Sequence, residues 1–230
     1  MTKIIVIIPA FNEEQSIANV VNDIPKNIVD TIIVVNNNST DNTAKVATHA
    51  GANVLLESKM GYGYACLKGM EYIAQQNLHP DIIVFLDGDY SDYPEQIPLV
   101  VAPILNDNID LVIGSRNNSQ RAKNSMTPQQ VFGNWLATSL MKLFFKANFT
   151  DLGPFRAIKY QKLLELNMTD KTYGWTVEMQ LKAVKSNFNY TEVPVKYRER
   201  IGVSKVSGTI KGTIFAGIKI LSWIFKYSLK

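Results

Sequence analysis

Two aspartates separated by one glycine, Asp87-Gly88-Asp89, directly follow the apolar run 82–86. A short run this rich in strand-forming residues predicts a buried strand, and the two carboxylates then lie where that strand leaves the sheet. Open α/β sheets bind ligands just outside the carboxyl ends of their strands. Two carboxylates there need water, hydrogen bonds or a cation, and a divalent ion that also binds phosphate oxygens suits them. By spacing alone, a turn built on two aspartates fits equally well.

Polar segments also follow the other predicted strands. The run 4–8 ends in Pro9-Ala10-Phe11-Asn12-Glu13, where Asn12 is a candidate helix N-cap. The run 31–35 ends in three asparagines, whose amides can form hydrogen bonds with a ligand. Gly61-Tyr62-Gly63 opens a helix that carries Lys68, and the glycines there allow the backbone to approach a ligand. This glycine pair is a weak signal, since it matches neither the Walker nor the dinucleotide pattern.

The first 116 residues alternate between strand and helix about five times. This alternation predicts an α/β fold with a doubly wound, mostly parallel sheet and right-handed crossovers. Further strands are expected near 110–114, after Asp151 and at 190–195, and long helices at 129–146 and from 209 onward. The polar segment 117–127 fits either a loop near the site or a solvated surface loop.

The composition is that of a globular protein with one large or two small domains. The chain has 230 residues, of which 46% are hydrophobic and 19% charged, and its net charge is +4. This small excess of positive charge is compatible with phosphate-bearing ligands or an anionic membrane. We expect no nucleic-acid partner. The single cysteine, Cys66, excludes an internal disulfide and fits a reducing cytoplasm. No segment reads as a signal sequence or a clear transmembrane helix.

The chain divides into a domain at 1–208 and a C-terminal amphipathic helix at 209–230. In this helix Lys211, Lys219, Lys226 and Ser222 fall within roughly 80° of one another on a helical wheel, and most of the remaining circumference is apolar. Such a helix can lie in a membrane interface, pack on a partner subunit or pack on its own domain. We expect a peripheral protein at the cytoplasmic face of the membrane, with homo-oligomer formation left open.

The order of the motifs resembles family 2 glycosyltransferases of the GT-A fold, in particular dolichyl-phosphate mannosyltransferases and related polyprenyl-phosphate glycosyltransferases. The resemblance covers roughly residues 3–208. It rests on six segments in order: 8–14, 37–41, 61–69, 87–89, 114–116 and 151–156. It implies a GT-A sheet flanked by helices, a UDP- or GDP-sugar donor, a divalent cofactor (Mg²⁺ or Mn²⁺) and an inverting transfer to a membrane lipid acceptor such as a polyprenyl phosphate.

The predicted site residues form four groups. The nucleotide-sugar site comprises Pro9, Ala10, Phe11, Asn12, Glu13, Asn37, Asn38, Lys68, Asp87 and Gly88. The metal ligands are Asp87 and Asp89, and the candidate catalytic residues are Asp89, Asp151 and Arg116. Diphosphate and acceptor contacts are expected from Arg116, Arg121, Arg156, Arg198, Arg200, Ser204 and Lys205.

The chain departs from the family pattern at two places. Asparagines stand at 37 and 38, where one or two aspartates are common, so the identity of the base stays open. Ser91-Asp92 replaces a frequent Gln-His pair, which leaves the third protein ligand of the metal open between these two residues.

The expected chemistry depends on the acceptor. Cleavage of a sugar–diphosphate bond develops negative charge on the nucleotide, which a divalent ion at Asp89 and Asp87 would stabilise. An ionised lipid phosphate needs cations to position it, whereas a neutral hydroxyl acceptor needs a general base, for which Asp151 and Glu178 are candidates. Each also has a purely structural interpretation, Asp151 as a turn aspartate and Glu178 as an ion-paired glutamate. A nucleotide-sugar-binding module without activity is the other alternative, and a nucleotidyltransferase is disfavoured because 9–12 contains neither glycine nor a cation.

Overall fold

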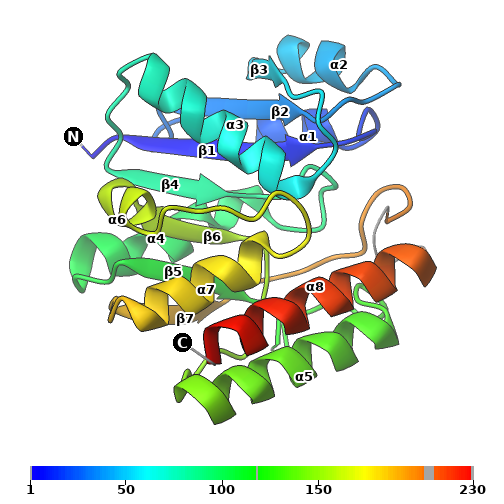
Figure 1. Cartoon of the computed structure of the whole chain (residues 1–230). Helices are drawn as coiled ribbons and strands as arrows, with labels where there is room; N and C mark the ends of the chain where they lie inside the picture. The colour runs from blue at the N-terminus through cyan, green and yellow to red at the C-terminus, as the bar shows by residue number, and fades with distance from the viewer. Residues whose placement is uncertain (1, 118, 205–209, 229–230) are drawn as a thin grey trace.

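The computed structural model describes residues 2–117, 119–204 and 210–228. The described residues form one seven-stranded sheet in the order β3-β2-β1-β4-β6-β5-β7, flanked by helices on both faces (Figure 1). The strands are β1 Ile4–Ala10, β2 Thr31–Asn36, β3 Asn53–Leu56, β4 Ile82–Phe85, β5 Leu111–Ser115, β6 Arg156–Lys159 and β7 Tyr190–Pro194. The α/β fold is thus confirmed.

Helices cover the sheet in two unequal layers. One face is covered by α1 Ile17–Asp23, α2 Thr43–His49 and α4 Ile97–Asn106, the last preceded by the 3-10 turn η1 Pro94–Gln96. The other face is covered by α3 Tyr62–Gln75, α5 Pro128–Phe145, α6 Tyr160–Glu165, α7 Trp175–Lys185 and α8 Ile210–Ser228.

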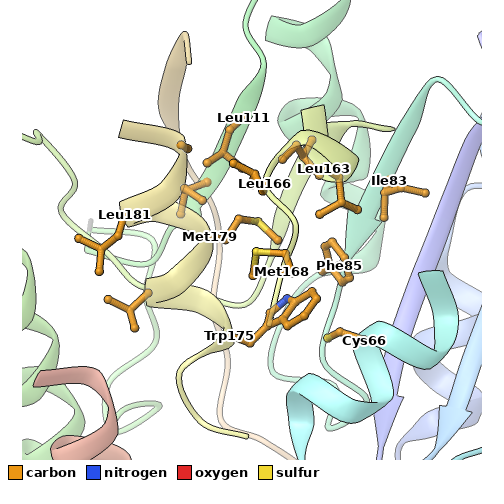
Figure 2. Packing of buried hydrophobic residues seen from close by; sticks show 14 of the residues in the cluster. Cys66, Ile83, Phe85, Leu111, Leu163, Leu166, Met168, Trp175, Met179 and Leu181 are labelled. Carbon is orange, nitrogen blue, oxygen red and sulfur yellow. The ribbon is translucent and has the colours of Figure 1, made fainter. Parts of the chain in front are cut away.

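Alternate residues of β4 enter opposite cores. Ile82 and Val84 pack in the core of the α1 and α4 face, whereas Ile83 and Phe85 pack in the core of the α7 face. In that second core the Phe85 ring meets the Trp175 ring edge to face, with centroids 5.9 Å apart (Figure 2). A strand covered on both faces must be apolar throughout, which is why this segment reads as a continuous apolar run.

The sheet is mixed because β6 runs antiparallel between β4 and β5. The remaining strand pairs are parallel, in agreement with the predicted mostly parallel sheet. The reversal has a local consequence, since Arg156 at the start of β6 pairs with Phe85 at the end of β4. The segment that leads into β6 therefore reaches the edge of the sheet where Asp87 lies.

The C-terminal helix α8 lies beside α5 and also contacts α7 (Figure 1). The Phe144 and Phe225 rings join α5 to α8, with centroids 5.9 Å apart. The predicted boundary at 208 and 209 falls outside the described residues. Among the residues that are described, no helix combines the length and apolarity needed to cross a bilayer.

Candidate functional site

A cleft of about 340 Å³ opens beyond the carboxyl ends of β1 and β4. It brings together nine of the predicted site residues: Pro9, Ala10, Phe11, Glu13, Asn37, Asp87, Gly88, Asp89 and Arg200. Parallel strands end at the same edge of a sheet, so the polar segments that follow β1, β2 and β4 meet there. The structure thus brings these segments together at one edge of the sheet.

Buried carboxylate oxygens without a partner lie in the segment 87–92 that follows β4. Asp87 Oδ1 and both side-chain oxygens of Asp92 are shielded from solvent, and none has a hydrogen-bond partner within the described part of the chain. Burial, followed by the nearby charge of Asp89, raises the pKa of Asp87 to about 7. Burial, together with Asp87 and Asp89, also holds the pKa of Asp92 well above its usual range. Unpaired buried carboxylates are costly, and a cation would relieve this cost.

Asp89, in contrast, is tied on both oxygens. Its Oδ1 accepts hydrogen bonds from the Ser91 backbone N–H at 2.9 Å and the Ser91 hydroxyl at 2.5 Å. Its Oδ2 pairs with Arg200 Nη1 at 3.0 Å, and Arg200 Nη2 also pairs with Glu13 at 2.9 Å. The Arg200 guanidinium therefore supplies positive charge between two carboxylates of the cleft.

These residues fit a metal held jointly with a phosphorylated ligand. Within the ranges that the structure covers, no three His, Cys, Asp or Glu side chains form a cluster arranged to hold a metal. Mg²⁺ is commonly bound through one or two carboxylates plus phosphate oxygens and water, so Asp87 and Asp89 suffice as protein ligands. Ser91 already serves Asp89, whereas Asp92 keeps its oxygens unpaired.

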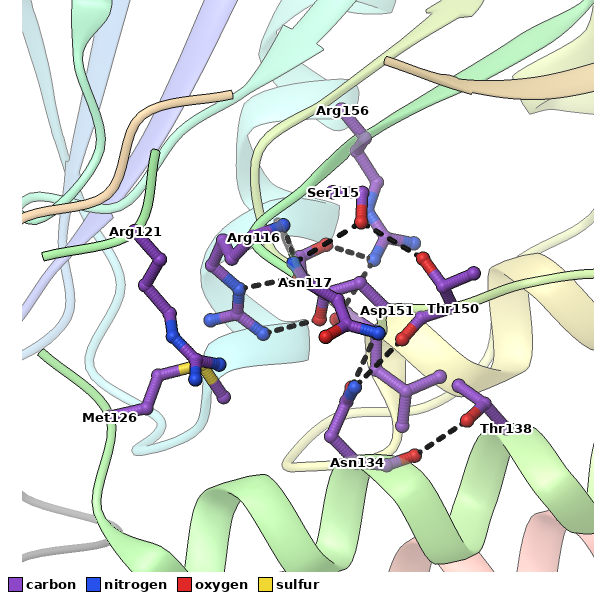
Figure 3. Close-up of polar contacts among 12 residues, drawn as sticks. Ser115, Arg116, Asn117, Arg121, Met126, Asn134, Thr138, Thr150, Asp151 and Arg156 are labelled. Atoms are coloured by element: carbon purple, nitrogen blue, oxygen red, sulfur yellow. Dashed lines mark hydrogen bonds and ion pairs between the residues drawn. The ribbon is translucent and has the colours of Figure 1, made fainter. Parts of the chain in front are cut away.

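The other two predicted catalytic residues, Arg116 and Asp151, form a buried ion pair with each other (Figure 3). Asp151 Oδ2 accepts from Arg116 N at 2.7 Å and Nε at 2.8 Å, and Oδ1 accepts from Nη2 at 2.6 Å. Although burial acts in the opposite direction, the Arg116 charge and its hydrogen bonds hold the pKa of Asp151 below its usual range. A carboxylate with every oxygen engaged by a cation is a poor general base.

Glu178, the other candidate base, is engaged in the same way. It is fully buried, and it accepts hydrogen bonds from the backbone N–H groups of Thr169 and Asp170 and from the Thr169 hydroxyl. Lys182 pairs with it at 2.7 Å, one turn along α7. Glu178 is therefore the ion-paired structural glutamate that the sequence had left open as an alternative.

Two predicted cations hold the scaffold and do not line the cleft. Arg156 is fully buried and donates to the carbonyls of Leu152, Gly153 and Thr176. Burial lowers its pKa to about 10. Arg198 stacks its guanidinium carbon 3.5 Å and 3.9 Å from the ring centroids of Tyr90 and Tyr93. Arg156 thus shapes the turn before β6, and Arg198 clamps its own loop to the segment after Asp89.

Three further predicted phosphate-binding residues, Arg116, Arg121 and Ser204, are not among the residues that line the cleft. Arg116 lies over the Tyr197 ring at 5.0 Å, and Arg121 forms an isolated bridge with the backbone of Tyr197. Ser204 is half-buried at the end of the loop that contains Arg200. Lys205 falls outside the described residues.

Three predicted nucleotide contacts, Asn12, Asn38 and Lys68, are not among the residues that line the cleft. Asn12 is in the left-handed region with φ 55° and is not a helix cap, because its Oδ1 accepts from Thr40 N. Asn38 is exposed, also with a positive φ. Lys68 pairs with Glu71 on the surface of α3. Asn37 lines the cleft, but its amide donates to the carbonyls of residues 57 and 59 and accepts from Gly61 N, so it mainly shapes the wall.

Five further residues line the cleft and were not predicted as ligands: Met60, Gly61, Tyr62, Thr172 and Tyr173. The Gly61-Tyr62-Gly63 segment correctly predicts the start of a helix. Lys68, the ligand predicted on that helix, does not line the cleft. No local pattern marks Thr172 and Tyr173, because they reach the cleft through contacts with residues more than a hundred positions away. The Gly63 N–H, for example, donates to the Thr172 carbonyl at 3.3 Å.

Comparison with known proteins agrees with this geometry. Residues 5–166 match the model of the family described as glycosyl transferase family 2. A UDP-N-acetylglucosamine–dolichyl-phosphate N-acetylglucosaminyltransferase of Methanococcus voltae is 30% identical over 214 residues, covering 84% of each chain. An undecaprenyl-phosphate mannosyltransferase of Micrococcus luteus is 26% identical over 233 residues, covering 96% of this chain and 93% of that one.

The fold also matches a solved structure. Glucosyl-3-phosphoglycerate synthase from Mycobacterium tuberculosis superposes with a TM-score of 0.79 at 20% identity, covering 99% of this chain and 78% of that one. The likeness supports the GT-A arrangement of sheet and helices. With the family model spanning most of the chain and the cleft lying where the motifs converge, the chain belongs to glycosyl transferase family 2.

Proposed function

We propose that the protein is a divalent-metal-dependent, inverting glycosyltransferase that moves a sugar from a UDP- or GDP-sugar to a lipid phosphate, most simply a polyprenyl phosphate. One observation carries the choice of acceptor. The cleft contains Arg200, a cation that a phosphate can contact, whereas the two carboxylates considered as bases, Asp151 and Glu178, are saturated by structural partners. A phosphate acceptor is already ionised and requires cations rather than a base.

The donor end of the cleft suits a nucleoside diphosphate. Phe11 and Met60 offer apolar surface for a base, and Asp87 and Asp89 face the same space. A bound Mg²⁺ or Mn²⁺ would neutralise the charge that develops on the leaving diphosphate. Arg200 adds a second positive charge at this end, and Ser91 orients Asp89 through two hydrogen bonds.

Asp92 is a weak candidate for the base that a hydroxyl acceptor would need. It is 1% exposed and does not belong to the lining of the cleft. A group that cannot reach the acceptor cannot remove its proton. The names of the two relatives, which specify dolichyl phosphate and undecaprenyl phosphate, support the same choice, although the structural neighbour was crystallised with phosphoglyceric acid.

A transfer assay tests this function directly. Purified protein, Mn²⁺ or Mg²⁺ and labelled UDP- and GDP-sugars are incubated with a polyprenyl phosphate, with the corresponding polyprenol or with phosphoglyceric acid. We expect transfer to the polyprenyl phosphate alone, and its loss when EDTA removes the metal. Transfer to the polyprenol would refute the phosphate requirement, and donor binding without transfer to any acceptor would support the alternative of a binding module.

We further propose that α5 and α8 together dock on an anionic lipid surface, which would place the enzyme at the cytoplasmic face of the membrane. The two neighbouring helices carry large, exposed apolar side chains: Val131, Phe132, Trp135, Leu143, Phe144, Ile214, Ile218 and Phe225. Large exposed apolar areas on a protein mark interaction sites.

Charge selects anionic lipid as the partner. Residues 111–150 and 200–230 contain eleven of the 24 Lys and Arg residues and none of the 20 Asp and Glu residues. The remaining sequence carries thirteen basic residues against twenty acidic ones. Basic residues beside an apolar helical face favour anionic head groups, whereas a subunit interface has no need of such a bias.

The tryptophans provide an intrinsic reporter of docking. Trp135 is 58% exposed, whereas Trp175 and Trp223 are buried. Vesicles that contain anionic lipid should shift the emission of Trp135 to shorter wavelength, and neutral vesicles should not. Leu143→Asp should abolish the shift, and Leu99→Asp, at an exposed position on α4, is the matched control. A dimer that Leu143→Asp converts to monomer without any lipid effect would instead identify a subunit interface.

A further inference from the structure

The carboxylate of Asp170 joins α8 to the segment that walls the donor cleft. Its side chain is fully buried and receives four hydrogen-bond donors. Oδ1 accepts from the backbone N–H groups of Thr172 at 2.7 Å and Gly174 at 3.0 Å. Oδ2 accepts from Trp223 Nε1 at 2.6 Å and pairs with Lys219 Nζ at 3.2 Å. One oxygen thus shapes the turn, while the other holds the C-terminal helix.

The turn held by Oδ1 is part of the donor cleft. Thr172 and Tyr173 line the cleft directly. The carbonyls of Lys171 and Thr172 also accept hydrogen bonds from the N–H groups of Tyr64 and Gly63 at the start of α3. A Cβ on Gly63 would lie 2.1 Å from the Asp170 carbonyl, so glycine is required for this approach. The turn and the start of α3 therefore form one connected wall.

The contact between Asp170 Oδ2 and α8 is also tightly packed. Trp223 and Lys219 are four residues apart on α8, so both reach Asp170 from the same face of that helix. A Cβ on Gly174 would lie 2.4 Å from Trp223 Nε1, which leaves no room for any other residue. Among the α8 residues whose side chains the structure describes, none lines the cleft, so we expect an influence of α8 on the donor to pass through such a contact.

We infer that Asp170 is a positioning residue of the donor site, through which α8 sets the place of the Thr172 and Tyr173 wall. The inference rests on the proposed function, since it takes the cleft to be the nucleotide-sugar site. Removing the donors on α8 leaves a buried carboxylate oxygen unsatisfied, and the turn must shift to rehydrate it. The helix with the apolar outer face and the donor cleft then behave as one mechanical unit.

The test uses the full chain with Trp223→Phe and Lys219→Met combined, which removes both donors and keeps apolar bulk. We expect KM for the nucleotide sugar to rise about tenfold, as for loss of hydrogen bonds to a charged group, while kcat at saturating donor changes less than about twofold. Lys219→Arg combined with Trp223→Phe keeps a cation for Asp170 and should retain part of the affinity that the double variant loses. Ser222→Ala, on the same helix but bonded only to the Lys219 carbonyl, is the control and should change neither constant.

A double-mutant cycle and hydrogen exchange separate positioning from general loss of stability. Asp170→Asn should raise KM in the wild type but add little in the double variant, because the contacts it removes are already gone. The amides of Gly63, Tyr64 and Gly174 should exchange faster in the double variant, a measurement that needs no ligand. Unchanged KM, or equal loss of kcat and kcat/KM, would overturn the inference. A wild type that binds no nucleotide would refute the proposed function, and the exchange rates would still decide whether α8 holds the wall.

Discussion

The carboxylates in and near the cleft differ from those of the scaffold in how their buried oxygens are satisfied. Asp87 and Asp92 have buried oxygens without hydrogen-bond partners among the described residues. Asp151 and Glu178 accept several hydrogen bonds each and pair with Arg116 and Lys182. The difference teaches that a buried carboxylate oxygen without a partner points to a ligand site, although Asp89 shows that a carboxylate of the cleft can also be satisfied, by Ser91 and Arg200. Residue type and sequence spacing do not separate the two groups.

The strongest test of the comparison replaces a carboxylate of the cleft by its amide. Asp89→Asn should lower transfer by about a thousandfold or more, because a metal that stabilises the leaving group contributes several kcal/mol. Initial rates at saturating metal and donor measure the loss. Asp107→Asn, at an exposed position after α4, is the control and should be silent. Retention of normal turnover by Asp89→Asn would remove Asp89 from the mechanism.

The corresponding change outside the cleft should act on stability. Asp151→Ala leaves Arg116 buried without its bidentate partner, which should lower the free energy of unfolding by about 3–5 kcal/mol. Urea denaturation measures this change. Adding Arg116→Met should recover part of the loss, since the unpaired charge is then removed as well. A small effect of Asp151→Ala would mean that the pair is not the scaffold contact described.

Asp87→Asn should have the opposite effect on stability, because burial disfavours the charged form of Asp87. Its raised pKa of about 7 means that the folded protein binds this proton more tightly than the unfolded chain does. The stability contribution is fully present below the unfolded pKa and is lost as pH rises through the folded pKa.

The stability gain of Asp87→Asn over the wild type should therefore be absent near pH 4, grow toward pH 7 and level off above it. We expect up to about 4 kcal/mol at pH 8 in the metal-free protein, from urea denaturation at a series of pH values. A gain that is independent of pH would show that Asp87 does not titrate in this range.

Arg200 qualifies the comparison, since it partners Asp89 from within the cleft. If the guanidinium stands where a cation is needed, Arg200→Gln should tighten Mn²⁺ binding to the nucleotide-free protein several-fold, about 1 kcal/mol. Isothermal titration with Mn²⁺ alone measures this affinity. Weaker Mn²⁺ binding would instead show that Arg200 holds the carboxylates in place for the ion.

The smallest effect is expected at Lys68, whose ion pair with Glu71 lies on the outer surface of α3. Lys68→Ala should change both the free energy of unfolding and the affinity for a nucleotide sugar by less than about 0.5 kcal/mol. A thermal-shift titration with UDP- and GDP-sugars measures both. A large loss of nucleotide affinity would return Lys68 to the donor site that the sequence predicted for it.

Much of the fold and of the donor cleft is readable from local sequence. Apolar runs such as 4–8 and 82–86 predict buried strands, and the polar residues that follow them predict the edge where a ligand binds. These inferences succeed because strand formation depends on side-chain type over a few neighbouring residues, and parallel strands end at a common edge. Asp87, Asp89 and the segment 9–13 needed no knowledge of distant contacts.

The partners of each charged side chain could not be read in this way. Arg156 and Arg198 have the residue type of a phosphate ligand, yet one is enclosed by backbone carbonyls and the other lies between two tyrosine rings. The insertion of β6 between β4 and β5, which brings Arg156 to that position, also leaves no local signal.

By itself, then, the sequence determined the strands, the order of the motifs along the chain and the acidic pair at the end of β4. Only the tertiary structure decided which carboxylates are saturated, that Thr172 and Tyr173 wall the cleft, and that α8 is tied to it through Asp170. The physical reason is that satisfaction of a buried charge depends on donors brought from distant parts of the chain. Asp170 and Trp223 are 53 residues apart, and no pattern within either segment specifies their meeting.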